Sequence, residues 1–223
     1  MDTTAFFALN YGLYIVSSAV GEERSGCVVN TFSQVTSNPI QVSVTLNKEN
    51  NTTQVIERSG LFTVVCLAQD APLELIGTFG FHSSIDTDKF AEWPHTCDEG
   101  GVPFVTEHTV ARFSAKVVAT LDVGTHIIFI GEAIEAEVTS AATPMTYAYY
   151  HQVKGGKTPP KASTFAAEQT IPVVLSDPTA PTKKRIGWLC TVCGYIEWAD
   201  ELPEDFTCPV CGAGKESFER IEE

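Results

Sequence analysis

Apolar side chains along residues 11–138 recur mostly in short runs that are separated by turn-forming residues. The segments "YGLYIVSSAV", "CVVNTF", "IQVSVTL" and "LFTVVCL" are rich in Val, Ile, Phe and Tyr, which favour strands. Residues 111–138 predict two longer strands joined at "DVGT", a hairpin with Gly124 at its bend. We therefore predict strands at 11–20, 27–32, 40–46 and 61–67, followed by this hairpin.

Helical patterns are fewer. In "NNTTQVIERSG", Asn50 can cap a helix and Gly60 can end it, while Val55 and its neighbour give a buried face. The segments "PLELIGTFG" (72–80) and "DTDKFAEW" (86–93) are shorter candidates. Many strands with few short helices predict a mainly β domain, built as a closed or half-closed antiparallel barrel.

The chain divides into a large part and a small part. Its 223 residues can bury one sizeable core and still append a small module. The stretch "SDPTAPTKK" is rich in Pro and small residues, which is typical of a linker. We predict a large domain over residues 1–175, a linker at 176–185 and a cysteine module at 186–223.

Composition excludes several classes of protein. The chain is 43% hydrophobic, as in folded proteins, and its formal charge of −14 argues against nucleic acid or an anionic membrane as partner. No apolar run approaches the roughly 20 residues of a membrane helix. The start carries Asp2 and no basic region, unlike a signal peptide. Seven cysteines, an odd number, suit metal binding in a reducing compartment, so we expect a cytoplasmic protein.

The negative charge is unevenly distributed. The cysteine module holds nine acidic residues against Lys215 and Arg220. This surface either keeps the protein in solution or docks a positively charged redox partner. The composition leaves both interpretations open.

Two Cys-x-x-Cys knuckles carry the strongest chemical signal. Their four thiolates suit tetrahedral coordination of zinc or of a single iron ion. Gly194 and Gly212 follow the knuckles and let the backbone aim N–H groups at the sulfur atoms. We predict a metal site, with zinc and iron both possible from spacing alone, at Cys190, Cys193, Cys208 and Cys211.

The large domain offers a candidate phosphate cradle. Hydroxyl and amide side chains gather in "TFSQVT" (31–36), and Lys48 precedes the predicted helix that begins near Asn50. Free N–H groups at a helix N-terminus, together with hydroxyls and a lysine, suit a phosphate. An ordinary helix cap beside a surface loop explains the same residues. No Gly-x-Gly-x-x-Gly motif or hydrolase motif accompanies them.

The cysteine module resembles rubredoxin, the one-iron electron carrier. The resemblance covers residues 186–223 and rests on "WLCTVCGYIEW" and "CPVCGAGKESFERIEE". The loop between the knuckles is shorter than in typical rubredoxins and resembles that of the rubredoxin-like tail of rubrerythrins. The resemblance implies one iron ion per module and leaves its redox potential open.

The large domain resembles the flavin reductase-like split barrels, in particular the flavoredoxin branch, over nearly all of residues 5–172. The motifs are "NTFSQVTSNPIQVSVTLNKENNTTQVIERSGLFTVVCL", "SSIDTDKF" and "TYAYYHQVKGGKTP", in family order. The resemblance implies bound FMN and a homodimer. Residues Asn30, Thr31, Phe32, Ser33, Gln34, Val35 and Thr36 would line the flavin ring, and Lys48, Asn50, Asn51, Thr52 and Thr53 would hold its phosphate.

Together the two parts resemble the high-molecular-weight rubredoxins, in which a flavin reductase-like domain is fused to rubredoxin. This implies an FMN-dependent oxidoreductase that passes electrons from NADH or NADPH through FMN and iron to an acceptor such as a flavodiiron protein. No side chain is required as a catalytic acid or base, because the cofactor carries the hydride chemistry. A free-flavin reductase with structural zinc, or an electron carrier that uses no nicotinamide, remains open.

The segment at 149–161, "YYHQVKGGKTPPK", carries three lysines and a histidine in an acidic protein. It is either a solvated loop or a clamp beside the flavin that attracts the phosphates of NAD(P)H. The histidines His82, His95, His108 and His126 are scattered, and we expect them to be structural.

Overall fold

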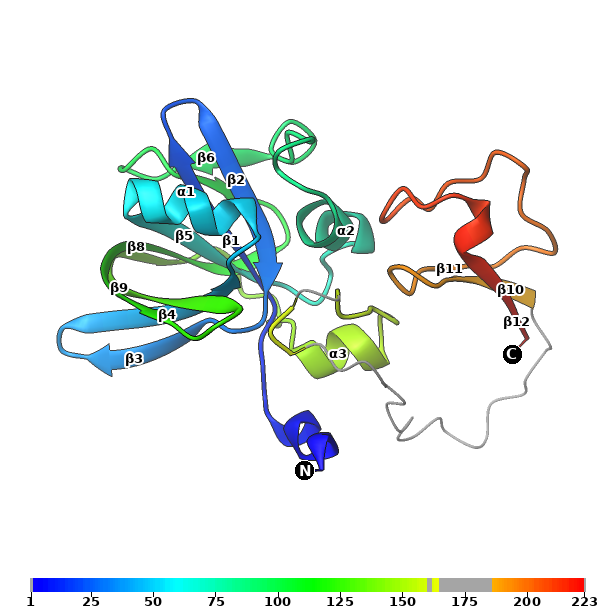
Figure 1. The fold of residues 1–223 in the computed structure, drawn as a ribbon, viewed down its shortest axis with the longest axis horizontal. Coiled ribbons are helices and arrows are strands. Elements are labelled where there is room, and N and C mark those ends of the chain that lie inside the picture. Colours follow the sequence, from blue (N-terminus) through cyan, green and yellow to red (C-terminus); the bar gives the residue numbers. More distant parts are fainter. Residues whose placement is uncertain (1, 160–161, 165–185, 223) are drawn as a thin grey trace.

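A computed structural model describes residues 2–159, 162–164 and 186–222. The predicted linker at 176–185 lies outside these residues. The large domain is built on a seven-stranded antiparallel sheet in the order β2-β1-β5-β8-β9-β4-β3 (Figure 1). Its strands are β1 (Tyr14–Val20), β2 (Glu23–Val29), β3 (Ser33–Ser37), β4 (Ile40–Asn47), β5 (Leu61–Leu67), β8 (Thr109–Asp122) and β9 (His126–Val138).

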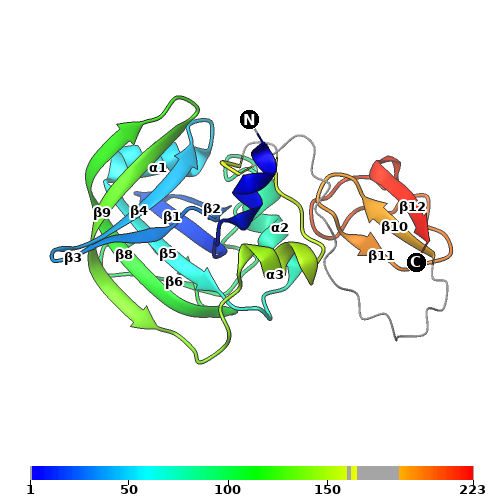
Figure 2. The ribbon, with the colours of Figure 1, turned by 90° about the horizontal axis from the view of Figure 1, so that it is seen from below.

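The sheet curves into an incomplete barrel (Figures 1 and 2). The longest pairing joins β8 to β9 through the predicted turn, where Gly124 adopts a φ of 92°. Within the described residues the edge strands β2 and β3 do not pair with each other. The mainly β prediction is confirmed, and the strands predicted at 11–20, 40–46 and 61–67 are present as β1, β4 and β5.

The sequence of strand β5 is almost continuously apolar because both of its faces are buried. Phe62 and Val64 belong to a buried cluster that includes Phe129, whereas Val65 and Leu67 belong to a second cluster. Side chains alternate between the two faces of a strand, and here both faces are buried. The second cluster holds residues of α2 (Leu73–Phe81), which packs on the outer side of the sheet.

Helix α1 (Asn51–Ser59) confirms the prediction made from its caps. The Asn50 side chain accepts a hydrogen bond from the Thr52 N–H at 3.0 Å. Gly60 ends the helix in a left-handed conformation with φ 68°, and its N–H donates to the Ile56 carbonyl at 2.8 Å. Helix α2 also confirms its prediction, but the helix predicted at 86–93 is wrong, because these residues form only turns.

Several elements were not predicted. Strand β3 is exposed along its length and polar at four of five positions, so it lacks the alternation of a half-buried strand. The short strands β6 (His95–Cys97) and β7 (Pro103–Val105) form a separate two-stranded sheet. Also unpredicted are the 3-10 helices η1 (Thr3–Ala8) and η2 (Lys215–Ser217), the helix α3 (Tyr147–Gln152) and the strands of the cysteine module.

The cysteine module folds around its own small sheet in the order β11-β10-β12, with bounds Ile196–Glu197, Ile186–Cys190 and Phe218–Glu222. Its core holds the cysteines together with Leu202, Val210 and Phe218. No helix among the described residues is long and apolar enough to cross a membrane.

The module packs against the helices α2 and α3 of the large domain (Figures 1 and 2). Leu73 and Phe81 of α2 join the core of the module. Gly77 lies so close to Val210 that a Cβ at position 77 would lie 2.7 Å from the Val210 Cγ1. The two parts therefore share a closely packed contact in which glycine is required.

Candidate metal centre and adjoining pocket

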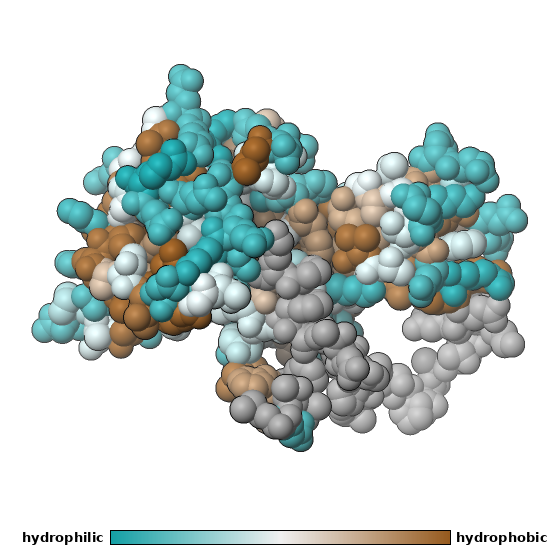
Figure 3. All heavy atoms as spheres, in the orientation of Figure 1, coloured by the Kyte–Doolittle hydropathy of each residue, from teal (hydrophilic) through white to brown (hydrophobic). Residues whose placement is uncertain are grey.

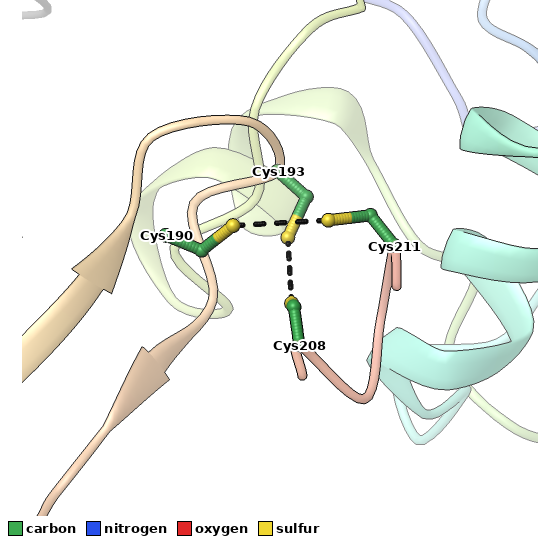
Figure 4. Close-up of side chains that lie close together, drawn as sticks. All are labelled: Cys190, Cys193, Cys208 and Cys211. Carbon is green, nitrogen blue, oxygen red and sulfur yellow. Dashed lines mark hydrogen bonds between the residues drawn. The ribbon is translucent and has the colours of Figure 1, made fainter. Parts of the chain in front are cut away.

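The four predicted cysteines converge on one point. Cys190 ends β10 and Cys193 lies in the turn that follows, whereas Cys208 and Cys211 lie in the loop before η2 (Figure 4). All four sulfur atoms lie within 4.8 Å of one another, with Sγ–Sγ distances of 3.7 Å for Cys190–Cys211 and 3.5 Å for Cys193–Cys208. Tetrahedral coordination with ~2.3 Å metal–sulfur bonds places sulfur atoms about 3.8 Å apart. The cage therefore fits one metal ion.

Both knuckles share one backbone design. The Cys190 N–H donates to the Tyr195 carbonyl at 2.7 Å, and the Cys208 N–H donates to the Ala213 carbonyl at 2.8 Å. Gly194 and Gly212 adopt φ values of 85° and 70°, which favour glycine. This turn brings backbone N–H groups to the sulfur atoms, as the sequence predicted.

The electrostatics of the cage call for a cation. Burial raises the pKa of Cys193, and burial raises that of Cys211 to about 11. Burial also acts on Cys190, but hydrogen bonds from the N–H groups of Cys193 and Val192 hold its pKa below the usual value. Four thiolates are stable together only with a positive ion among them. The donor set thus fits iron or zinc.

A pocket of about 410 Å³ opens in the large domain beside the module. Its walls come from the ends of β2 and β4, the start of α1, the turn after α2, and α3 with the loop that follows it. This volume lies within the range of ordinary cofactor pockets. We call it the main pocket.

The main pocket gathers four of the twelve residues that were assigned to FMN, namely Asn30, Thr31, Asn50 and Asn51. Asn50 and Asn51 lie at the N-terminus of α1, where the free N–H groups of a helix suit an anion.

The remaining eight do not line it. Phe32, Ser33 and Gln34 line a second cavity of about 580 Å³ between β3, β4 and β9, and Val35 and Thr36 are exposed on β3. Lys48 forms an ion pair with Asp122 at 2.6 Å. Thr52 and Thr53 are fully buried, and their hydroxyls bond to Ser25 and to the Asn47 carbonyl. Their assignment to FMN stays a prediction.

The structure adds a second group of polar residues that the sequence analysis did not assign. His82, Ser83 and Ser84 follow α2 and line the main pocket with Lys89. The Lys89 ammonium is buried and donates to the carbonyls of Gly26 and Phe79 at 2.8 and 3.2 Å. Burial lowers the pKa of Lys89 to about 8, so near neutral pH it still presents a positive charge. The motif "HSSIDTDK" was the available signal.

His126 shows that the main pocket suits a polar ligand. It lines the pocket, and among the described residues its buried Nε2 has no hydrogen-bond partner. Buried polar atoms are normally satisfied, so an unpaired one beside a cavity indicates that a ligand or water completes it. His82 and His126 both line the main pocket, and the expectation that they are structural stays a prediction.

The main pocket and the metal centre share a wall. Tyr150 and Lys157 line the pocket, and the same segment touches the module: a Cβ at Gly194 would lie 2.6 Å from the Gly155 carbonyl oxygen and 2.7 Å from the Lys157 Cγ. Tyr150 is buried, and its hydroxyl donates to the Lys157 carbonyl at 3.1 Å. Residues 149–159 thus contact both the pocket and the module through Tyr150, Gly155 and Lys157, while Gln152 and Val153 are exposed. Pro160 and Lys161 lie outside the described residues.

Comparisons with known proteins match both parts. Residues 6–156 match the flavin reductase-like domain, and residues 188–219 match the rubredoxin-like domain of rubrerythrin. The chain is 43% identical to a high molecular weight rubredoxin of Moorella thermoacetica, over 99% of this chain and 100% of that protein.

Two further relatives cover the large domain. A ferric-chelate reductase (NAD(P)H) of Archaeoglobus fulgidus is 47% identical over 74% of this chain and 98% of that protein. The solved structure of an NADH:FAD oxidoreductase, SgcE6 of Streptomyces globisporus, aligns with a TM-score of 0.58 and 25% identity, over 64% of this chain and 84% of that chain.

Proposed function

The chain belongs to the flavin reductase-like family, carries a rubredoxin-like domain and is a flavin-dependent oxidoreductase; from that premise we propose the route of its electrons. They enter from NAD(P)H at FMN in the main pocket, pass to one iron ion held by the four cysteines, and leave to a separate acceptor. The observation that carries this proposal is the shared wall. Tyr150 and Lys157 line the pocket, while Gly155 and Lys157 contact the turn that holds Cys193.

The residues of the main pocket fit FMN in charge and polarity. The N-terminus of α1 with Asn50 and Asn51, together with Lys89, would hold the phosphate, since a buried ammonium and free N–H groups both favour an anion. Asn30, Thr31 and the unpaired Nε2 of His126 would bond to polar edges of the ring. A bound flavin accepts a hydride and can release its electrons singly, which a one-iron centre requires.

The shared wall gives iron a role that structural zinc would lack. Packing the module on α2 and α3 makes transfer between the two centres effectively intramolecular. The backbone N–H groups directed at Cys190 stabilise negative charge on sulfur and tune a redox potential. A zinc ion would need neither a neighbouring pocket nor this tuning.

For the acceptor we propose a separate redox protein with a positively charged docking face, such as a flavodiiron protein. Thr191 and Val192, between the cysteines of the first knuckle, are exposed, so a partner can approach the metal centre there. The module around them is strongly acidic. We expect rising ionic strength to slow electron transfer to the partner but not NAD(P)H oxidation with free ferricyanide as acceptor. If the rate of electron transfer to the partner did not change with ionic strength, electrostatic docking would be contradicted.

We also propose a homodimer. Apolar side chains are exposed on the hairpin β8–β9 and on β4, including Leu121, Ile134 and Ile40 at 57%, 53% and 53% (Figure 3). Such a patch on a soluble surface is typical of an interface, and its continuity with the sheet suits a second copy of the chain. Sedimentation should give twice the 24.2 kDa of one chain; a monomeric mass would contradict the proposal.

The test of the proposed route is anaerobic titration of the purified protein with NADH or NADPH. We expect one FMN and one iron per chain, and we expect the flavin absorption and the ferric absorption to bleach together. If the flavin bleaches while the ferric spectrum persists, the intramolecular route is wrong. A chain that holds zinc even after growth in iron-rich, zinc-depleted medium would favour a flavin reductase with a structural metal.

A further inference from the structure

A chain of hydrogen bonds runs from the main pocket to His151. The Asn30 side-chain amide, on the pocket wall, donates to the Thr164 hydroxyl at 2.8 Å, and Thr164 donates to the Tyr147 hydroxyl at 3.4 Å. The Tyr147 hydroxyl bonds to the Thr158 hydroxyl, which lies 3.3 Å from the Nε2 of His151. Tyr147 itself lines the pocket, so the chain begins where the cofactor would bind.

The donor and acceptor of each hydrogen bond in this chain can be deduced by starting from His151. The Nδ1 of His151 lies 2.6 Å from the Gly156 carbonyl oxygen, which can only accept, so Nδ1 carries the proton of the neutral ring. Nε2 is then an acceptor, and Thr158 must donate to it. Each hydroxyl has a single proton, so Tyr147 donates to Thr158 and accepts from Thr164. All donors therefore point away from the pocket and toward His151.

The proposed function requires a path for a proton. NAD(P)H delivers a hydride, which is two electrons and one proton, whereas a one-iron centre takes electrons only. Oxidation of one NAD(P)H with reduction of two ferric to two ferrous ions therefore releases one proton. That proton must leave the main pocket as electrons leave for the metal centre.

We propose that Tyr147, Thr158 and His151 form this proton exit. Tyr147 takes up a proton from the pocket at its oxygen as it gives its own to Thr158, and Thr158 gives its own to the Nε2 of His151. The half-exposed imidazolium then gives a proton to water. This inference rests on the proposed function, because it assumes that a proton is left in the pocket.

The position of His151 suits a relay. Its ring packs against Tyr147 and Tyr150, with centroids 4.3 and 5.2 Å away, and the Gly156 carbonyl faces Nδ1. Burial lowers the pKa of His151, so near neutral pH the ring is neutral and can accept a proton. Gly155 and Lys157, on either side of Gly156, contact Gly194 of the first knuckle. Proton and electrons would thus leave the pocket along the same segment.

The kinetic test follows reoxidation alone. Holoprotein reduced anaerobically with dithionite is mixed with ferricyanide, which takes one electron and no proton, so neither NAD(P)H nor the iron route is needed. We expect His151→Gln and Thr158→Val each to slow flavin reoxidation about tenfold. Loss of a fully buried acid–base group typically slows a reaction by roughly 10²-fold or more. The effect here should be smaller, because water in the pocket can also accept the proton. Added imidazole should restore the rate of His151→Gln. Wild-type rates and solvent isotope effects in both variants would overturn the proposal.

The pH dependence of flavin reoxidation tests whether His151 is the proton acceptor. Below the pKa of His151 the ring already holds its proton and cannot accept another, so wild-type reoxidation should slow as pH falls through that pKa. His151→Gln keeps a hydrogen-bond acceptor for Thr158 but has no such titration, so its rate should be flat there. A matched control is His108→Asn, at a half-buried histidine that bonds to Asp70 outside the chain, where Asn tolerates the φ of 57°. A variant profile that keeps the wild-type inflection would contradict the assignment to His151.

A second measurement needs only the folded protein. Nitrogen NMR of histidine-labelled protein should show His151 with a protonated Nδ1 and a bare, hydrogen-bonded Nε2 at neutral pH. Thr158→Val should shift the Nε2 signal and leave Nδ1 bonded. If Nε2 carries the proton, the hydrogen bonds run in the opposite direction and the proton exit is wrong, even if NAD(P)H reduces the iron. If Nδ1 carries the proton but NAD(P)H does not reduce the iron, only the proposed electron route is wrong.

Discussion

Replacing Cys208 with Ser should stop electron delivery to the acceptor while NAD(P)H still bleaches the flavin. The Cys208 sulfur lies 3.5 Å from that of Cys193, and a serine hydroxyl does not ionise to replace the thiolate. Even changes outside the ligand shell cost about 10–100-fold in metal affinity, so we expect acceptor reduction to fall by more than about 100-fold. The small module also depends on its metal for folding, so its structure should loosen.

The measurement is stopped-flow absorption with NADH under anaerobic conditions, with metal content determined on the same sample. The matched control is Cys97→Ser, at an exposed thiol of β6 that lies outside the cage. This control should leave both signals at wild-type rates. If Cys208→Ser lost its metal and still passed electrons to the acceptor, the metal centre would not be on the route.

Much of the fold could be predicted from local signals. Asn50 and Gly60 predicted both ends of α1, because capping depends on neighbouring residues only. Gly124 predicted the hairpin between β8 and β9 for the same reason. The helix predicted at 86–93 is wrong because its apolar Phe90 is buried against Phe79 by tertiary packing and not along a helical face. Exposed β3 is held by pairing with β4, which no local pattern reveals.

The metal centre could be predicted, and the pocket only in part. Knuckle spacing fixes four ligands within a short stretch, so the cage needs no long-range information. The main pocket combines residues from β2, α1, the turn after α2 and α3, which lie far apart in the sequence. The family motifs gave Asn30 and Asn50, and one of them contains Lys89 without a role assigned to it, whereas His126 reaches the pocket through the fold alone. The hydrogen-bond chain to His151 is likewise visible only in three dimensions.

The packing of the module on the large domain left one trace in the sequence, Gly77 in the middle of α2. Glycine weakens a helix by about 1 kcal/mol relative to alanine, so its presence there needs a reason. The structure supplies one, because a Cβ at this position would overlap the Val210 carbonyl oxygen and lie 2.7 Å from its Cγ1. A backbone atom cannot rotate away as a side chain can.

Gly77→Ala should therefore stabilise α2 and displace the module. We expect the large domain to unfold at an equal or higher temperature, because alanine favours the helix by about 1 kcal/mol. We expect the metal to remain bound, because no cysteine is changed. Electron transfer from flavin to iron should slow at least about tenfold, because Leu73 and Phe81 lose their packing on the module and the two centres are no longer held together.

The control is the same substitution one turn along the same helix. At Gly80 the nearest atoms to a Cβ are those of Val28 at 3.6 and 3.7 Å, an ordinary contact, so Gly80→Ala should leave the module docked. Stopped-flow traces give the flavin and iron signals separately, and small-angle scattering reports whether the chain extends. If Gly77→Ala extended the chain and iron reduction kept its wild-type rate, the contact with α2 would not govern electron transfer. The wall formed by Tyr150 and Lys157 would then lose its role in the route.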